Sequence, residues 1–169
     1  MFRYLKWMAV ALLALPLVAG AAAPSIVLKD QDGKTRNVSE FIGQGKWTVV
    51  AVWSADCPIC RREIHHMAFF HDEHKKSDAH VMGLSIDSEA GRAKALAFID
   101  DHSLSFPNLI GDPDVAAELG GGMFIGTPTF YVYSPEGKLA AQRVGAVTLQ
   151  QMEDLLRQLK AKQAKPKAD

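Results

Sequence analysis

The sequence has no surplus of either charge and almost no cysteine. Its 169 residues carry 19 Lys and Arg against 19 Asp and Glu, so the formal net charge is zero. Binding to nucleic acid or to an anionic membrane surface would therefore need a local basic patch. Only two cysteines are present, which excludes a disulfide-stapled scaffold. The 48% hydrophobic and 22% charged composition excludes a low-complexity or wholly disordered chain, and one globular domain is the default for this length.

The amino terminus has the pattern of a secretory signal peptide. Arg3 and Lys6 form a basic segment, residues 8–18 are apolar, and small residues follow. Such a segment is removed on export. We expect cleavage after Ala21, so that residues 1–21 are the signal peptide, and an uncleaved membrane anchor is the alternative. No cysteine ends the apolar segment, which excludes a lipoprotein. The sequence therefore predicts a periplasmic protein, in a compartment where a cysteine pair tends to be oxidised.

Hydrophobic patterning after this segment predicts strands that alternate with helices. Apolar, β-branched runs indicate buried strands, and amphipathic segments or segments that start with proline indicate helices. The expected strands are 25–30, 47–53, 80–86, 129–133 and 138–144, and the expected helices are 58–76, 88–102, 112–119 and 148–160. This order predicts an α/β domain over residues 22–160, with a mixed central sheet flanked by helices and an N-terminal strand extension. Residues 161–169 are expected to be a disordered basic tail.

The two cysteines, Cys57 and Cys60, stand where a buried strand meets a long helix. Reactive groups collect at the carboxyl ends of such strands. Free N–H groups and the helix dipole would stabilise a thiolate at Cys57, just before the helix. Cys60, one turn further, could attack a mixed disulfide formed at Cys57. Because the loop between them is too short to stabilise a fold much, the pair is predicted to perform dithiol–disulfide exchange.

A metal site is an alternative use of the cysteines. Together with His71 and His74 they have a spacing seen in some zinc sites. Cys60 and His71, however, are eleven residues apart on one predicted helix, about 16 Å of rise, so a straight helix cannot bring them to one ion. Copper bound by Cys57, Cys60 and one histidine from elsewhere remains an alternative. The histidines within 65–74 are otherwise expected to be surface or packing residues that could bind metal adventitiously.

Inert thiols and a peroxidase are two further alternatives. Inert buried thiols are disfavoured, because the pair opens a helix and is followed by the basic Arg61 and Arg62. A peroxidase would use Ser54 together with Cys57. Such peroxidases carry a proline four residues before the serine or threonine, and this chain has Val50 there.

Together these features resemble the exported TlpA/ResA-type family of thioredoxin-like thiol–disulfide oxidoreductases. The resemblance covers residues 25–160. It rests on the C-x-x-C motif, on Trp53 four residues before it, on the segment Gly126-Thr127-Pro128-Thr129-Phe130 and on the turn Glu136-Gly137-Lys138. It implies a thioredoxin-like fold and a cis peptide bond before Pro128. It also implies a substrate-binding groove formed by Trp53, Thr127 and Pro128, where an extended client segment would pair with the backbone of Thr127.

The resemblance also assigns a role to Glu63. The family carries an acidic residue three positions after its second cysteine, and Glu63 can share a helical face with Cys60, Met67 and Phe70. A carboxyl on that face would be desolvated, its pKa raised, and able to exchange a proton with Cys60. A glutamate facing solvent is the alternative. Asp56 stands where the family usually has tryptophan, and its charge should oppose thiolate formation at the neighbouring cysteine.

The implied function is reduction of protein disulfides. Cys57 would attack the client, Cys60 would resolve the mixed disulfide, and Glu63 would move a proton. The resemblance implies a membrane thiol transducer as electron donor and apocytochrome c or a copper-site protein as client. An oxidant would use the same residues. A copper-handling chaperone, which would bind Cu(I) tightly and reduce no insulin, is the alternative of another class. A monomer is the default, and no cofactor, resident metal or nucleic acid is expected.

Overall fold

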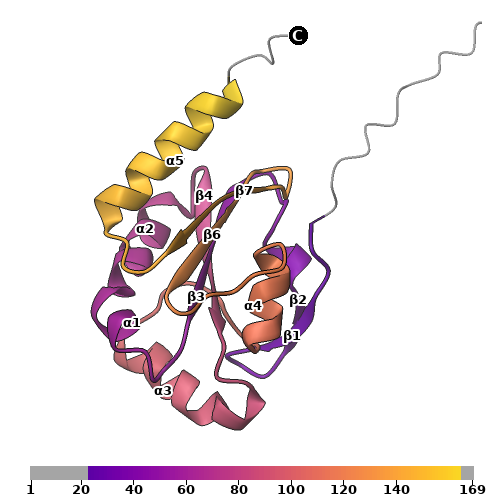
Figure 1. Cartoon of the computed structure of the whole chain (residues 1–169), viewed down its shortest axis with the longest axis vertical. Helices are drawn as coiled ribbons and strands as arrows, with labels where there is room; N and C mark the ends of the chain where they lie inside the picture. Colours follow the sequence, from indigo (N-terminus) through magenta and orange to yellow (C-terminus); the bar gives the residue numbers. More distant parts are fainter. Residues whose placement is uncertain (1–22, 165–169) are drawn as a thin grey trace, which may run out of the picture.

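The computed structural model describes residues 23–164, which form an α/β domain around a seven-stranded sheet (Figure 1). The strand order is β2-β1-β5-β4-β3-β6-β7. Neighbours among β3, β4 and β5 pair in parallel, and the other neighbouring pairs are antiparallel. The strands are β1 (Val27–Asp30), β2 (Thr35–Asn37), β3 (Trp47–Trp53), β4 (Ala79–Ser85), β5 (Asn108–Ile110), β6 (Thr129–Tyr133) and β7 (Leu139–Val144). The predicted mixed sheet with an N-terminal strand extension is therefore confirmed.

Helices cover both faces of this sheet, so the core has two parts. The first part receives side chains from α1 (Pro58–Glu63), α2 (His65–His74), α3 (Arg92–Asp101) and α5 (Leu149–Ala164). The second receives them from α4 (Pro113–Leu119) and from the short 3-10 helix η1 (Val38–Glu40). A second 3-10 helix, η2 (Glu89–Gly91), precedes α3. Alternate residues of β3 face the two parts, which explains why its sequence is apolar at every position except Thr48, whose hydroxyl donates to the Phe41 carbonyl.

Three elements differ from the sequence-based expectation. The helix predicted over 58–76 is divided at Ile64, where a tight turn joins α1 to α2: Ile64 N–H bonds the Cys60 carbonyl, and Met67 N–H bonds the Ile64 carbonyl. Strand β5 was not predicted. Helix α5 continues to Ala164 and so includes the first residues of the segment expected to be a disordered tail.

The length and composition of the described helices bear on membrane spanning. Within residues 23–164, no helix is long and apolar enough to cross a bilayer. The predicted signal peptide and its cleavage lie outside the described residues, as does the end of the predicted tail. Both stay predictions.

Candidate active site

The cysteine pair lies past the carboxyl end of β3, at the start of α1. Cys57 caps the helix, and its Sγ accepts a hydrogen bond from the Cys60 N–H at 3.1 Å. Pro58 occupies the first helical turn, where its missing N–H removes a donor that would have no partner. Cys57 is 9% exposed and Cys60 is completely buried. One sulfur can thus be reached from outside, while the other lies behind it.

The two thiols have opposite pKa shifts. Burial raises the pKa of Cys60, and the adjacent Cys57 raises it further. Burial also opposes ionisation of Cys57, but hydrogen bonds from the side chains of Cys60 and Thr127 and from the backbone N–H groups of Cys60 and Ile59 outweigh it and lower the pKa of Cys57. Cys57 is therefore the sulfur that ionises first and can attack a disulfide.

The loop before β6 faces the dithiol. Its Thr127–Pro128 peptide bond is cis, as the resemblance implied. The Cys57 thiol donates to the Thr127 carbonyl, with 3.5 Å between sulfur and oxygen. Gly145 N–H donates to the Pro128 carbonyl at 2.9 Å, so the turn after β7 lies beside the same loop. Thr127 and Pro128 therefore border Cys57, as predicted for residues of a substrate groove.

Trp53 does not line this groove. Its side chain is completely buried, stacks on Phe98 with ring centroids 4.5 Å apart, and donates from Nε1 to Asn108 Oδ1 at 3.2 Å. A buried indole with a satisfied N–H has no surface to offer a client. The substrate-binding role predicted for Trp53 is therefore wrong: it is a core residue that fixes the end of β3.

Glu63 lies at the end of α1 and is only partly buried. Its carboxylate is 3.5 Å from His66 Nε2 and 4.0 Å from Arg62 Nε, and its side chain is 26% exposed. No hydrogen bond joins Glu63 to a cysteine anywhere in the described part of the chain. The predicted face is buried at Cys60, Met67 and Phe70, whereas Glu63 turns to surface partners. Desolvation of Glu63 is thus corrected to partial exposure, and its proton-transfer role stays a prediction.

A surface ion pair partly compensates the negative charge beside the dithiol. Asp56 and Lys94 form an ion pair of 3.0 Å between Oδ2 and Nζ, and both side chains are largely exposed. Arg61 donates to the Ala55 carbonyl at 2.8 Å and lies over the Phe98 ring. The negative charge that Asp56 brings next to Cys57 is therefore partly compensated by Lys94.

Asp87 is a site residue that the sequence did not reveal. It follows β4, and its carboxylate accepts hydrogen bonds from Ser54 Oγ at 2.7 Å, from Ala55 N–H at 2.9 Å and from Ser85 Oγ at 2.7 Å. These bonds fasten the loop between β3 and Cys57 to the end of the neighbouring strand. Asp87 is thus a positioning residue for the nucleophile. It lies 33 residues from Ser54 in sequence, so no local pattern could have identified it.

Comparison with known proteins now assigns the family. Residues 19–142 match the AhpC/TSA family. This chain belongs to the AhpC/TSA family. It is 25% identical over 142 residues to the thiol-disulfide oxidoreductase ResA of Halalkalibacterium halodurans, covering 84% of this chain and 77% of that protein. It is 27% identical over 137 residues to the thioredoxin-like protein YneN of Bacillus subtilis, covering 81% and 78%.

Solved structures agree with the fold. The crystal structure of StoA from Bacillus subtilis superposes with a TM-score of 0.63 at 20% identity, covering 81% of this chain and 98% of that one. A putative thiol:disulfide interchange protein DsbE from Chlorobium tepidum gives 0.68 at 23% identity, covering 84% and 95%. The thioredoxin-like fold and the TlpA/ResA-type resemblance are confirmed. This AhpC/TSA-family protein is a thioredoxin-like thiol–disulfide oxidoreductase.

The alternatives gain no support from the geometry of this AhpC/TSA-family site. For a peroxidase, Ser54 would have to serve the substrate, but its hydroxyl donates to Asp87. For copper, the cysteines would need a third ligand. Within residues 23–164, the only group of three or more His, Cys, Asp or Glu side chains with clustered ligand atoms is Glu73, His74 and Glu153, and it contains neither cysteine. His71 is buried and accepts from Val81 N–H at 3.1 Å, which is a packing role.

Proposed function

We propose that this protein reduces disulfides of other exported proteins in the periplasm, using the Cys57-Pro58-Ile59-Cys60 dithiol. The observation that carries the proposal is the asymmetry of the pair: an ionisable, reachable Cys57 in front of a sealed Cys60 whose pKa is raised. The N-terminal signal pattern supports the location. A membrane thiol transducer would return the enzyme to its reduced form, and apocytochrome c or a copper-site protein would be the client.

The reaction has two steps of thiol–disulfide exchange. The Cys57 thiolate attacks one sulfur of the client disulfide, forms a mixed disulfide and releases the other client sulfur as a thiolate. Cys60 then loses its proton and attacks the Sγ of Cys57, which releases the second client thiolate and leaves the enzyme disulfide. The two client thiolates take up two protons. Two electrons pass from the enzyme dithiol to the client, and the enzyme is oxidised.

The surface beside the dithiol suits a protein client. Thr127 and Pro128 border Cys57, and a backbone segment can add to such a loop as an extra strand. Met123 and Ile125, in the loop that leads to this proline, are about 70% and 69% exposed. Exposed large apolar side chains in this loop suit contact with a protein client.

The direction of electron flow follows from how strongly the reduced form is stabilised. An oxidant needs a reduced form with a strongly stabilised thiolate. Here burial raises the pKa of Cys60. Hydrogen bonds lower the pKa of Cys57, but burial and the negative Asp56 beside it, which Lys94 only partly compensates, limit the stabilisation of its thiolate. These features favour a reductant.

The reduction potential of the dithiol is the first test. The purified protein is equilibrated in dithiothreitol or glutathione buffers, and the fraction with free thiols is measured. A potential near or below about −230 mV supports the reductant, and a potential above about −150 mV would make it an oxidant. If no reversible two-electron couple is found and Cu(I) binds tightly, the oxidoreductase function is wrong and copper handling replaces it.

Trapping of the mixed disulfide is the second test. Cys60→Ser removes the resolving sulfur, so this variant should accumulate a covalent complex with a disulfide-containing client that dithiothreitol releases. Cys57→Ser is the matched control and should form none. Equal trapping by both variants would contradict the assigned order of attack.

A further inference from the structure

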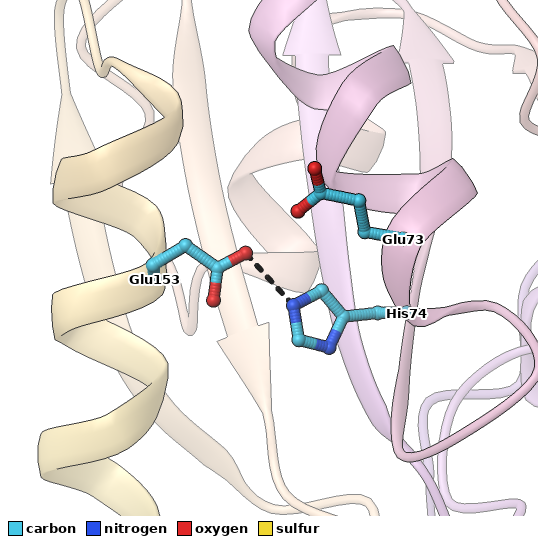
Figure 2. Close-up of side chains that lie close together, drawn as sticks. All are labelled: Glu73, His74 and Glu153. Atoms are coloured by element: carbon cyan, nitrogen blue, oxygen red, sulfur yellow. Dashed lines mark hydrogen bonds and ion pairs between the residues drawn. The ribbon is translucent and has the colours of Figure 1, made fainter.

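A second cluster of functional side chains lies away from the dithiol, between α2 and α5. It contains Glu73 and His74 at the end of α2 and Glu153 on α5, with ligand atoms that all lie within 4.8 Å of one another. Figure 2 shows the two carboxylates and the imidazole facing the same gap between the helices. The loop that follows α2 leads into the amino end of β4, whereas the dithiol lies past the carboxyl end of the parallel β3. The cluster is therefore at the opposite end of the sheet from the dithiol.

His74 is held by both of its ring nitrogens. Nδ1 is 2.8 Å from Asp78 Oδ1, and Nε2 is 2.8 Å from Glu153 Oε1. A neutral imidazole can donate from only one nitrogen. If Nδ1 donates to Asp78, a neutral Nε2 would turn a lone pair towards a carboxylate oxygen, which is repulsive. The 2.8 Å contact with Glu153 therefore needs a proton on Nε2, and a metal ion bound by both atoms could take the place of that proton.

The arrangement around Nε2 is that of a metal-ligating histidine. Such a histidine almost always donates its other ring N–H to a carboxylate or carbonyl, which fixes the tautomer and orients the ring. Asp78 takes this place for His74, and Ser77 Oγ and Lys160 hold Asp78 in turn. The ring is only 18% exposed, so its direction towards Glu153 is fixed by packing between the two helices.

Glu73 supplies a third ligand atom that has no other use. Within residues 23–164 its carboxylate has no hydrogen-bond or ion-pair partner, yet it reaches from α2 towards α5 (Figure 2). It adds to a local excess of negative charge, because within residues 23–164 Lys160 is the one lysine or arginine in ion-pair contact with Glu73, Asp78 or Glu153. A proton on the imidazole leaves this group with one net negative charge, whereas a divalent ion beside a neutral imidazole balances it.

We propose that Glu73, His74 and Glu153 bind one divalent transition-metal ion of the zinc class. One imidazole nitrogen and two carboxylate oxygens are ligands that zinc accepts at about 2.0–2.2 Å, with water completing the tetrahedron. Forming the site needs side-chain rotation of the exposed Glu73 and a slight widening of the contact between His74 Nε2 and Glu153 Oε1. Because Glu153 belongs to α5 and the other two ligands belong to α2, the ion would join these helices and stabilise the packing of α5 against the domain.

The test measures Zn²⁺ binding to the oxidised protein after removal of any affinity tag. In this form the Cys57–Cys60 disulfide cannot act as a metal ligand. Isothermal titration with Zn²⁺ at about pH 7.5 gives the affinity, and Co²⁺ absorption gives an independent view of the coordination. Glu73→Gln is the main variant, because an exposed side chain without partners can change without disturbing the fold. His74→Gln removes the central ligand, and His66→Gln on the same helix is the matched control.

We expect one equivalent of Zn²⁺ to bind the wild type, with an affinity that falls at least tenfold in Glu73→Gln, or about 1.4 kcal/mol. The loss should be larger in His74→Gln and absent in His66→Gln. Zinc should raise the melting temperature of the wild type more than that of Glu73→Gln, whereas the two should melt alike without metal. If millimolar Zn²⁺ does not bind, or if only His66→Gln loses binding, the proposal is wrong and the cluster is an ordinary proton-bridged ion pair.

Discussion

Asp87 makes a prediction about how the nucleophile is held in place. Its carboxylate accepts from Ser54 Oγ, Ala55 N–H and Ser85 Oγ. Ser85 is completely buried and Ala55 is 2% exposed, so water cannot replace the lost acceptor for these two donors in Asp87→Ala. Leaving a buried donor unsatisfied costs about 1–3 kcal/mol. Two such donors make a loss of about 3 kcal/mol in the free energy of unfolding, or roughly 6–12 °C in melting temperature.

The conservative variant Asp87→Asn should be much milder. Its amide oxygen can still accept from Ala55 N–H and Ser85 Oγ, and its NH₂ can donate to Ser54 Oγ, which is a hydroxyl and can reverse its role. Only the charge assistance is lost, so we expect about 1 kcal/mol. Both variants are measured against the wild type by urea denaturation, followed through tryptophan fluorescence.

A second readout separates positioning of the nucleophile from general stability. The rate of iodoacetamide reaction with Cys57 in the reduced protein is measured against pH. Asp87→Ala frees the loop before Cys57, so its thiolate should form at higher pH than in the wild type, whereas Asp87→Asn should move little. A loss of less than 1 kcal/mol in Asp87→Ala, together with an unchanged pH midpoint, would refute the role assigned to Asp87.

Three further predictions follow from the pKa shifts and from the core. Because the pKa of Cys57 is lowered and that of Cys60 is raised, iodoacetamide should modify one thiol per reduced molecule near pH 8, identified as Cys57 by mass spectrometry. Trp53→Phe keeps the ring stack but leaves the buried Asn108 oxygen without its donor, so the free energy of unfolding should fall by about 1–2 kcal/mol. The KM for a client should stay unchanged in this variant. Burial lowers the pKa of His74, but hydrogen bonds to two carboxylates outweigh it and raise that pKa. In metal-free protein, the free energy of unfolding that His74 contributes should therefore be complete below about pH 6.5 and should fall as the pH rises through the raised pKa. Denaturation curves of His74→Gln should lack this pH dependence.

The sequence predicted the elements whose own residue composition indicates that they are buried. All seven residues of β3 are buried, and its apolar, β-branched composition, broken only by Thr48, predicted this. Strand β5 has only three residues after a proline, and it is a strand because β4 and β1 pair with it from either side. Pairing between distant segments leaves no local pattern. The break at Ile64 was missed for a similar reason, since the residues around it suit a helix and only the turn geometry divides them.

The site was predictable where the chemistry depends on spacing along the chain. Two cysteines three residues apart at a strand-to-helix junction identified the dithiol, and the family pattern identified the loop at Pro128. Trp53 and Glu63 show the limit of the same reasoning. Both occupy family positions, but position in a motif does not report exposure: Trp53 is buried in the core, and Glu63 contacts Arg62 and His66 at the surface.

The complete burial of Cys60 determines what can happen after the first attack. A small oxidant or a free thiol can reach Cys57 but has no path to the sulfur behind it. An external thiol can release a captured client at Cys57, but attack by Cys60 from within the same molecule is faster, because the two sulfurs meet at a very high effective concentration. Each encounter with a client therefore either transfers two electrons to it or ends with the enzyme dithiol and the client disulfide unchanged. Burial also protects the Cys60 sulfur from stepwise oxidation to sulfinic and sulfonic acids, which would abolish its reactivity as a thiol.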